Sequence, residues 1–388
     1  MVTTEREPVK FQVNRDVFAD AVSFAVKLLP QRTTLPILSG VLLRADGDTV
    51  TLSSFDYEVS AQTAITADIE ENGTVLVSGR LLAEIAARLP NAPVQFTTEE
   101  GKIAVHCGTA RFTLSSMPVE EYPSLPVVDG PTGVLPGDAF SDAVGQVAVA
   151  ASRDDVTPVI TGVQLEIAEN RLSLVATDRY RVAVREIDWE SASVAEGVTA
   201  LVPARTLSEI GKIFGHSAQI SVTIVTGSER ELIAFAADQK TVTSLLIKGN
   251  FPPVRRLFPE TVENYAVMNT AELIEGTRRV ALVLERDAAL RYTFSVDGLT
   301  LEAIGSENAQ ASESIDAHLV GDDTVVSLKP QFLIDGLTAV HSEFVRISFT
   351  KTDNPNKPGP VLITSQSSKD QPGTDNYRYL LQPNLLLR

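Results

Sequence analysis

The residues of this sequence that could carry out covalent chemistry are few, and their spacing assembles no complete catalytic set. His341 and Glu343 have the spacing that opens a zinc-deaminase signature, but the Pro-Cys-x-x-Cys half of that signature does not follow. The sequence also lacks a glycine-rich phosphate loop and a Gly-x-Ser-x-Gly nucleophile elbow. We therefore expect no catalytic residues and no enzymatic activity.

The remaining reactive pairs have simpler interpretations. His106 and Cys107 fall in a strand-like segment, which indicates a packing role. The acid pairs at 120–121 and 154–155 flank turn-like segments and are typical of solvated loops. Four histidines and one cysteine leave little material for a metal site. We expect no metal and no cofactor.

Basic residues are placed more regularly. Arg80, Glu84 and Arg88 are spaced so that they share one face of a predicted helix, and Arg205 and Lys212 share a face of another. The apolar residues of these helices, Leu81, Leu82, Ile85 and Leu89 in the first and Leu207 and Ile210 in the second, are predicted to face the core. A solvated polar face is the simplest interpretation of either helix alone.

These two helices belong to a long repeat. The segment 77–85 (VSGRLLAEI) matches 202–210 (VPARTLSEI), and a third copy lies at 328–336 (LKPQFLIDG). An earlier motif at 16–22 (DVFADAV) recurs at 138–144 (DAFSDAV) and weakly at 271–276 (AELIEG). The copies of the 77–85 segment are 125 and 126 positions apart, the length of a whole domain rather than of a solenoid unit. We predict three domains, at 1–128, 129–260 and 261–388.

Each repeat reads as helix, strands, helix, strands. Helices are predicted at 14–29, 78–89, 137–151, 203–214, 270–284 and 330–340. The first has Asn14 as its N-cap and a buried side formed by Val17, Ala21, Phe24 and Leu28. Strands without intervening helices pair as antiparallel meanders, so the predicted fold class is α+β with both helices on one side of the sheets. Polar loops are predicted at 351–360 and 365–376.

Composition limits the class of protein. An apolar fraction of 44% suits globular domains, and one cysteine suits a reducing, cytoplasmic setting. No apolar run approaches the roughly 20 residues of a membrane span, and the first residues lack the pattern of a secretory signal. The net charge of −17 is shared about equally by the three repeats. Charge alone favours an acidic protein that does not bind nucleic acid.

Three stretches nevertheless carry a family resemblance. They are 32–40 (RTTLPILSG), 176–184 (ATDRYRVAV) and 251–259 (FPPVRRLFP). With them, essentially the whole chain resembles the bacterial DNA polymerase III beta subunit, the replication sliding clamp, in its actinobacterial form.

The resemblance implies a closed ring formed by a head-to-tail homodimer, with helices on the inner face and antiparallel sheets outside. Such a ring holds double-stranded DNA without sequence preference, needing only loose phosphate contacts inside, so an acidic exterior is compatible with it. On this basis Arg32, Arg80 and Arg205 are inner-wall candidates. Lys212 joins them through its helix face, and Arg153 through its loop.

The resemblance also implies a peptide pocket between the second and third domains. The DNA polymerase III catalytic subunit, the clamp loader and other clamp-binding proteins would dock there through short Gln- and Leu-containing segments. Transferred position by position, the pocket residues are Ile160, Thr177, Tyr180, Arg181, Val182, Pro252, Arg256, Leu257, Phe332, Pro360, Leu381, Gln382, Pro383 and Asn384. The family usually ends Met-Pro-aliphatic-Arg, so Gln382 and Asn384 are departures that put pocket affinity in question.

Three alternatives stay open at this stage. One is an extra clamp copy whose altered pocket confers insensitivity to a clamp-binding inhibitor. Another is an acidic three-domain protein-binding scaffold that does not bind DNA. The third is an enzyme built on the same repeat, although the sequence offers no assembled nucleophile, base or metal set.

Overall fold

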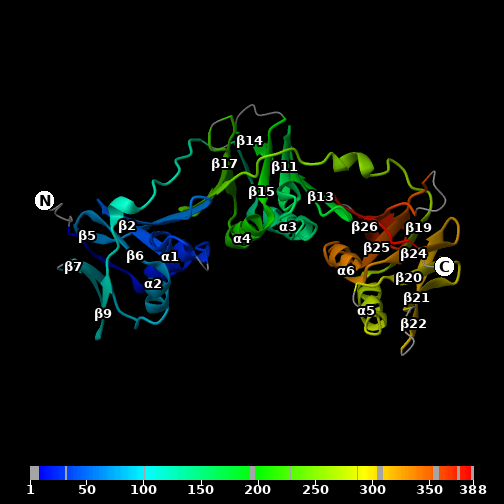
Figure 1. Ribbon diagram of the computed structural model, residues 1–388, viewed down its shortest axis with the longest axis horizontal. Helices are drawn as coiled ribbons and strands as arrows, with labels where there is room; N and C mark the ends of the chain where they lie inside the picture. The colour runs from blue at the N-terminus through cyan, green and yellow to red at the C-terminus, as the bar shows by residue number, and fades with distance from the viewer. Residues whose placement is uncertain are drawn as a thin grey trace. The chain divides into compact units, whose positions relative to one another are not determined.

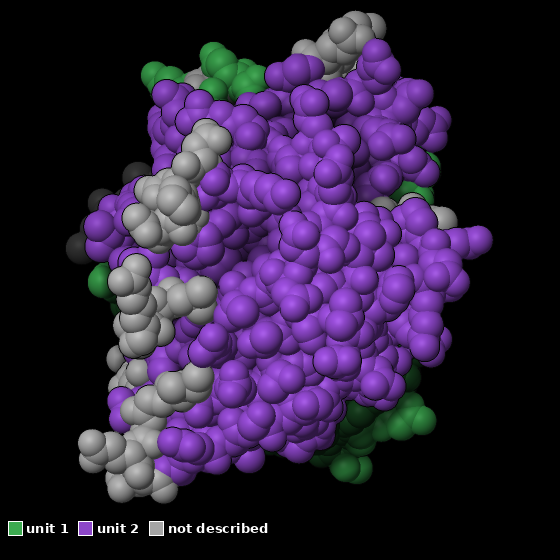
Figure 2. All heavy atoms as spheres, turned by 90° about the vertical axis from the view of Figure 1, so that its right-hand side faces the viewer, with its two compact units in different colours: residues 1–137, 216–246 green, residues 138–215, 247–388 purple. Residues whose placement is uncertain are grey.

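The computed structural model forms two compact units, residues 1–137 with 216–246 and residues 138–215 with 247–388 (Figure 2). The residues that the structure describes are 8–30, 33–99, 101–130, 132–192, 197–227, 229–285, 287–303, 309–352, 358–373 and 376–385.

The first unit contains two α-helices, two short 3-10 helices and thirteen strands within its described residues. The helices are α1 (Arg15–Lys27), α2 (Gly79–Ala86), η1 (Pro36–Ser39) and η2 (Val119–Glu121). The strands are β1 (Lys10–Val13), β2 (Gly40–Asp46), β3 (Thr49–Phe55), β4 (Val59–Thr66), β5 (Asp68–Glu71), β6 (Gly73–Ser78), β7 (Val94–Glu99), β8 (Lys102–Cys107), β9 (Ala110–Ser115), β10 (Gly133–Leu135), β16 (Ile220–Val225), β17 (Leu232–Ala237) and β18 (Lys240–Leu245).

The second unit holds the remaining described elements. Its helices are α3 (Gly137–Ala148), α4 (Ala204–Phe214), α5 (Thr270–Ala281), α6 (Pro330–Thr338), η3 (Pro158–Ile160) and η4 (Val254–Leu257). Its strands are β11 (Gly162–Ala168), β12 (Arg171–Thr177), β13 (Arg181–Asp188), β14 (Glu190–Ser191), β15 (Thr199–Pro203), β19 (Tyr265–Asn269), β20 (Leu290–Ser295), β21 (Gly298–Ala303), β22 (Ala311–Ile315), β23 (Ala317–Val320), β24 (Thr324–Leu328), β25 (Phe344–Phe349), β26 (Val361–Ser368), β27 (Gln371–Pro372) and β28 (Tyr377–Leu381).

Antiparallel sheets organise both units. In the first unit one sheet runs β5-β1-β7-β8-β9, and another runs β10-β16-β17-β18-β4-β3-β2-β6. In the second unit the sheets run β15-β11-β12-β13-β28-β26-β25-β19-β23 and β22-β21-β20-β24. The predicted α+β class with antiparallel meanders is confirmed.

Two strand pairings join successive repeats of the sequence. β18, from the second repeat, pairs with β4 of the first, and β28, from the third, pairs with β13 of the second. These junctions explain why the compact units do not follow the repeat, since β16, β17 and β18 belong to the sheet that contains β2, β3 and β4.

The first unit's helices lie against each other and cover one side of its sheets, where α1 also contacts β3 and β4 (Figure 1). Asn14 caps α1 as predicted, because its Oδ1 accepts hydrogen bonds from the N–H groups of Asp16 and Val17. The predicted buried face of α1 was slightly misplaced. Val17 is 43% exposed, and Phe18 and Val22 are buried instead.

The α2 helix ends at Ala86 rather than at the predicted Leu89. Leu82, Ile85 and Leu89 are buried as predicted, but Leu81 is 46% exposed. Leu81 follows Arg80 directly on a helix of about 100° per residue, so it lies at the edge of the exposed face.

The predicted polar loop at 365–376 was wrong over its first part. Ser365 and Gln366 are buried in β26, where they pair with Val345 and Phe344 of β25, and β27 follows. Small polar side chains are typical of loops, but here they lie in a paired strand. Of the other predicted loop, 353–357 lies outside the described residues.

Candidate functional site: two adjoining cavities

A cavity of about 530 Å³ opens beside the β12–β13 turn in the second unit, and we call it the apolar cavity. Most of its wall is hydrocarbon, contributed by η3, β13, the 250–257 segment, the loop before β26 and the end of β28. The lining residues are Thr157, Val159, Ile160, Thr177, Arg179, Tyr180, Arg181, Val182, Asn250, Pro252, Val254, Leu257, Thr352, Pro358, Pro360, Leu380 and Gln382. Such a wall suits apolar side chains of a ligand.

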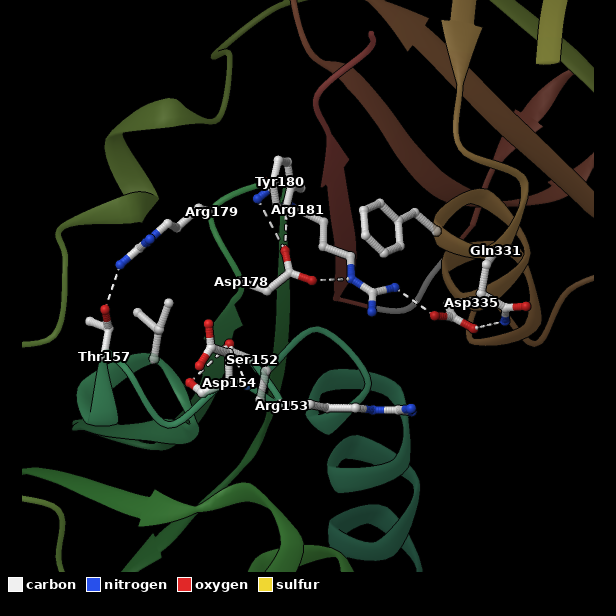
Figure 3. A pocket seen from close by; sticks show the side chains of 13 residues that line it. Ser152, Arg153, Asp154, Thr157, Asp178, Arg179, Tyr180, Arg181, Gln331 and Asp335 are labelled. Carbon is white, nitrogen blue, oxygen red and sulfur yellow. Dashed lines mark hydrogen bonds and ion pairs between the residues drawn. The ribbon is translucent and has the colours of Figure 1, made fainter. Parts of the chain in front are cut away.

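A second cavity of about 770 Å³ adjoins it, and we call it the polar cavity (Figure 3). The two share Thr157, Ile160 and the turn residues Arg179, Tyr180 and Arg181. The rest of the polar cavity is lined by Ala151, Ser152, Arg153, Asp154, Asp178, Gln331, Phe332 and Asp335. Apolar and polar compartments side by side suit an extended peptide that carries both kinds of side chain.

The turn between the cavities is held by one carboxylate. Asp178 Oδ1 accepts hydrogen bonds from the N–H groups of Tyr180 and Arg181, each at 3.1 Å. Arg179 adopts the left-handed backbone conformation, with φ at +78°. This tight turn leaves Tyr180 58% exposed at the rim of both cavities.

Arg181 is the buried charge beneath the turn. Its Nε lies 2.9 Å from Asp178 Oδ2, and its Nη1 lies 2.6 Å from Asp335 Oδ2. Nη1 also donates to the Tyr379 hydroxyl and Nη2 to the Val149 carbonyl. Because protein groups engage all three of its guanidinium nitrogens, Arg181 positions the cavity walls rather than presenting a free cation to a ligand.

The electrostatics of this cluster favour the charged guanidinium. Burial alone would lower the pKa of Arg181, but Tyr379, Asp335 and Asp178 outweigh burial and raise that pKa. Burial also raises the pKa of the Tyr379 hydroxyl, against the opposing effect of Arg181. Both groups therefore keep their protonation state throughout the physiological range.

Aromatic rings complete the rim. Tyr180 and Phe332 have ring centroids 6.0 Å apart. The Arg181 guanidinium lies 4.4 Å from the Phe332 centroid, and Lys329 Nζ lies near both rings. Cations over aromatic faces stabilise the ring positions, so the rim is preorganised.

The structure brings together most of the predicted pocket residues. Those that line the apolar cavity are Ile160, Thr177, Tyr180, Arg181, Val182, Pro252, Leu257, Pro360 and Gln382. Phe332 lines the polar cavity.

Four predicted residues line neither cavity. Leu381 is buried and follows the cavity-lining Leu380 on β28, so strand alternation directs it to the other face. Asn384 is exposed, and its N–H bonds to the Ser327 carbonyl. Pro383 is buried and Arg256 is exposed, both outside the linings.

Several lining residues were missed by the sequence reasoning. Among them, Leu380 could have been found by the period-two alternation that relates it to Gln382. Thr157, Val159 and Pro358 carry no comparable local signal, because their place depends on how the loops fold over the sheet.

The predicted DNA-contact residues lie in different surroundings. Arg80 is exposed on α2, where its Nη2 donates to the Pro30 carbonyl at 3.3 Å. Arg205 and Lys212 are exposed on α4, and Lys212 Nζ lies 2.8 Å from Glu209 Oε1. Arg153 lines the polar cavity. Arg32 lies outside the described residues.

Within the part of the chain that the structure describes, no group of three or more His, Cys, Asp or Glu side chains could hold a metal ion. The described helices include none with the length and apolar character needed to cross a membrane.

Cys107 is buried, and its Sγ donates to the carbonyls of Pro90 and Ala92.

Comparison with known protein families accounts for this arrangement. Models of the N-terminal, central and C-terminal domains of the DNA polymerase III beta subunit match residues 9–126, 134–253 and 255–370. The chain belongs to the DNA polymerase III beta subunit family. Three clamp domains are thus present, while the proposed boundaries at 128 and 260 remain predictions.

Individual relatives agree with the family assignment. The beta sliding clamp of Streptomyces coelicolor is 44% identical over 97% of this chain and 99% of its own length. The beta sliding clamp homolog GriR of Streptomyces muensis is 37% identical over 97% and 99%. The crystal structure of a Pseudomonas aeruginosa DnaN sliding clamp bound to griselimycin has a TM-score of 0.87 at 25% identity, covering 97% of this chain and 100% of that one. The resemblance seen in the sequence, including its actinobacterial character, is confirmed.

Proposed function

We propose that this chain is a DNA sliding clamp, which encircles double-stranded DNA and tethers the DNA polymerase III catalytic subunit and other partners to it. The observation that carries this function is the succession of three matched clamp domains, with 44% identity to a beta sliding clamp over nearly the whole chain. We infer a non-catalytic processivity role in the cytoplasm. In that role the protein catalyses no reaction itself but keeps the polymerase on the template.

The strand pairings support ring closure by a head-to-tail homodimer. At each junction inside the chain, the last strand of one repeat's second meander pairs with the third strand of the preceding repeat's first meander: β18 with β4, and β28 with β13. The strands at these two positions that have no such partner among the described strands are β9 and β22, and each is the edge strand of its sheet. Pairing β9 of one protomer with β22 of the other would repeat the same junction in trans and close the ring.

Arg80, Arg205, Lys212, Arg32 and Arg153 remain the proposed DNA contacts. A few basic side chains on helices supply phosphate contacts that are weak and independent of sequence, which permits sliding. The two cavities are the proposed docking place for partner peptides. There the apolar cavity takes apolar side chains and the polar cavity takes the rest of the segment.

The test is retention on circular DNA. The chain is loaded by a clamp loader onto nicked circles, which are then linearised. A topological clamp stays on the circle at high salt and leaves after linearisation, whereas an acidic scaffold that does not bind DNA is never retained.

The proposed wall residues are tested in the same assay. Replacing Arg80, Arg205 and Lys212 together with Ala should reduce clamp loading and retention on circular DNA. The matched control is Arg44→Ala/Arg171→Ala/Arg291→Ala, three exposed basic residues on strands. Equal retention by both triple variants, with the dimer intact, would show that the wall was chosen wrongly.

A further inference from the structure

The side chain of Gln382 is fixed at the wall of the apolar cavity. Its backbone N–H donates to the Tyr180 carbonyl at 2.8 Å, immediately after β28 ends. Its side-chain Nε2 donates to the Pro358 carbonyl at 3.1 Å, bridging from the strand end to the loop before β26. Anchored at both points, the amide has little freedom to turn away when a ligand enters.

The bond to Pro358 uses the Nε2 donor of the Gln382 amide and leaves its acceptor, Oε1, available to a ligand. Among the described residues, no hydrogen-bond donor reaches Gln382 Oε1. Two polar residues of the wall are engaged by other protein groups: the Thr177 hydroxyl donates to the Arg181 carbonyl, and Arg181 is bound to Asp178 and Asp335. The surrounding wall includes Val182, Val254, Leu257 and Leu380, which offer no donors.

We propose that Gln382 determines which partner segments the apolar cavity accepts, by requiring an N–H donor opposite its Oε1. This inference rests on the proposed peptide-docking function. A segment whose main-chain N–H meets Oε1 replaces the water that the acceptor loses. A ligand that covers Oε1 with hydrocarbon alone leaves a buried acceptor without a partner, and its affinity falls.

The bond to Pro358 increases the discrimination between ligands with and without an N–H donor, compared with a glutamine side chain that is free to rotate. A flexible side chain would rotate its oxygen back to solvent when an apolar ligand entered. Held by Pro358, the amide keeps its orientation, so the mismatch persists in the complex.

The experiment uses the full chain and titration calorimetry with a six-residue Gln- and Leu-containing peptide. The same peptide is prepared with each backbone amide N-methylated in turn, which removes one donor at a time. We expect one N-methylation to weaken binding to the wild-type chain about tenfold, equivalent to about 1.4 kcal/mol. Gln382→Met keeps the size of the side chain but removes the amide. In this variant, that same N-methylation should weaken binding no more than N-methylation of the other peptide amides does.

Two further variants complete the test: one separates the role of the Oε1 acceptor from that of the bond to Pro358, and the other is a control. Gln382→Glu keeps an acceptor but loses the Nε2 donor to Pro358, so it should retain the dependence on that one peptide N–H while binding more weakly overall. Asn384→Ala changes the other departing residue, which lies outside both cavities, and should match the wild-type chain.

The outcomes are distinct. If the peptide binds and no N-methylation couples to Gln382→Met, the specificity role is wrong while the docking function stands. If the wild-type chain binds no peptide at micromolar concentration, the docking function fails and the inference fails with it. Coupling that appears equally in Asn384→Ala and in Gln382→Met would also overturn the assignment to Gln382.

Discussion

Arg181 and Asp335 lie 154 residues apart in the sequence, yet Nη1 of one is 2.6 Å from Oδ2 of the other. The first begins β13 and the second lies on α6, so this ion pair joins two successive repeats in the wall of the polar cavity. Figure 3 shows the Arg181 side chain directed towards Asp335, with Asp178 on its other side. The geometry of the cavities therefore depends on one buried guanidinium.

Arg181→Met is expected to destabilise the protein by about 3 kcal/mol, because it leaves the Asp178 and Asp335 carboxylates without their partner. Urea unfolding measures the loss, and calorimetry should show that peptide binding weakens with it. Arg179→Met is the control, since Arg179 is exposed on the same turn. Equal stability of the two variants would contradict the structural role of Arg181.

Gly336→Ala tests the packing of α6 against the same cluster. A Cβ at this position would lie 2.6 Å from ring carbons of Tyr379, whose hydroxyl bonds to Arg181 and to the Phe332 carbonyl. Alanine normally stabilises a helix by about 1 kcal/mol relative to glycine. Here we expect the opposite sign, a lower midpoint of thermal unfolding together with weaker peptide binding, while a gain in stability would show that the ring yields easily.

Much of this architecture was predictable from local sequence. The six α-helices were located within a few residues, because caps such as Asn14 and prolines such as Pro330 mark their starts. The faces were less certain: Leu81 and Val17 lie at the borders of apolar stripes, where one residue of rotation changes burial.

The candidate site was predictable mainly through resemblance. Position-by-position transfer found Thr177, Tyr180 and Gln382, but it also admitted Leu381, whose side chain the strand alternation directs away. Which loops close the cavity depends on contacts between distant segments, such as the bond from Gln382 to Pro358, and no local pattern encodes them.

Leu380→Ala and Leu381→Ala provide a matched pair on adjacent residues. Both side chains are buried, so each truncation should cost about 2–5 kcal/mol of stability. Only Leu380 lines the apolar cavity, so only its truncation should weaken binding of an apolar peptide to the folded protein. Calorimetry below the unfolding transition separates the two effects, and similar binding losses in both variants would argue against the assigned strand faces.

Glu186 should contribute stability that depends on pH. Burial alone would raise its pKa, but hydrogen bonds and charges from Arg255, Arg378 and Arg171 outweigh burial and hold the pKa below its ordinary value. Since the folded pKa lies below the unfolded value of about 4.3, the contribution is complete above that pH and is lost as the pH falls through the folded pKa.

Glu186→Gln should therefore lower the free energy of unfolding by at most about 1 kcal/mol at pH 7, because the ion pairs are partly exposed. The difference from the wild-type chain should shrink towards pH 3. Urea titrations at several pH values measure it, with exposed Glu58→Gln as the control. If the difference in free energy of unfolding grew as the pH fell, the Glu186 carboxylate would not be stabilised in the folded state as argued.

Ring closure can be tested by cross-linking. Thr113 and Ser314 are exposed on β9 and β22, the strands proposed to pair in trans. A chain carrying Thr113→Cys and Ser314→Cys should give disulfide-linked dimers on mild oxidation, since the native Cys107 is buried. The pair Glu70→Cys/Ser314→Cys, which uses the opposite edge of the same sheet, should not. Cross-linking of both pairs alike would indicate random collision.

The strand edges at β9 and β22 also determine how the protein must behave on dilution. Two of the three kinds of junction are secured by the covalent chain, so only the third obeys mass action. A separated protomer would expose two sheet edges at once, each a template for any extended chain. Closure into a small ring then competes with open-ended growth, and the curvature of the subunit, more than the affinity of its edges, decides between a clamp and a fibre.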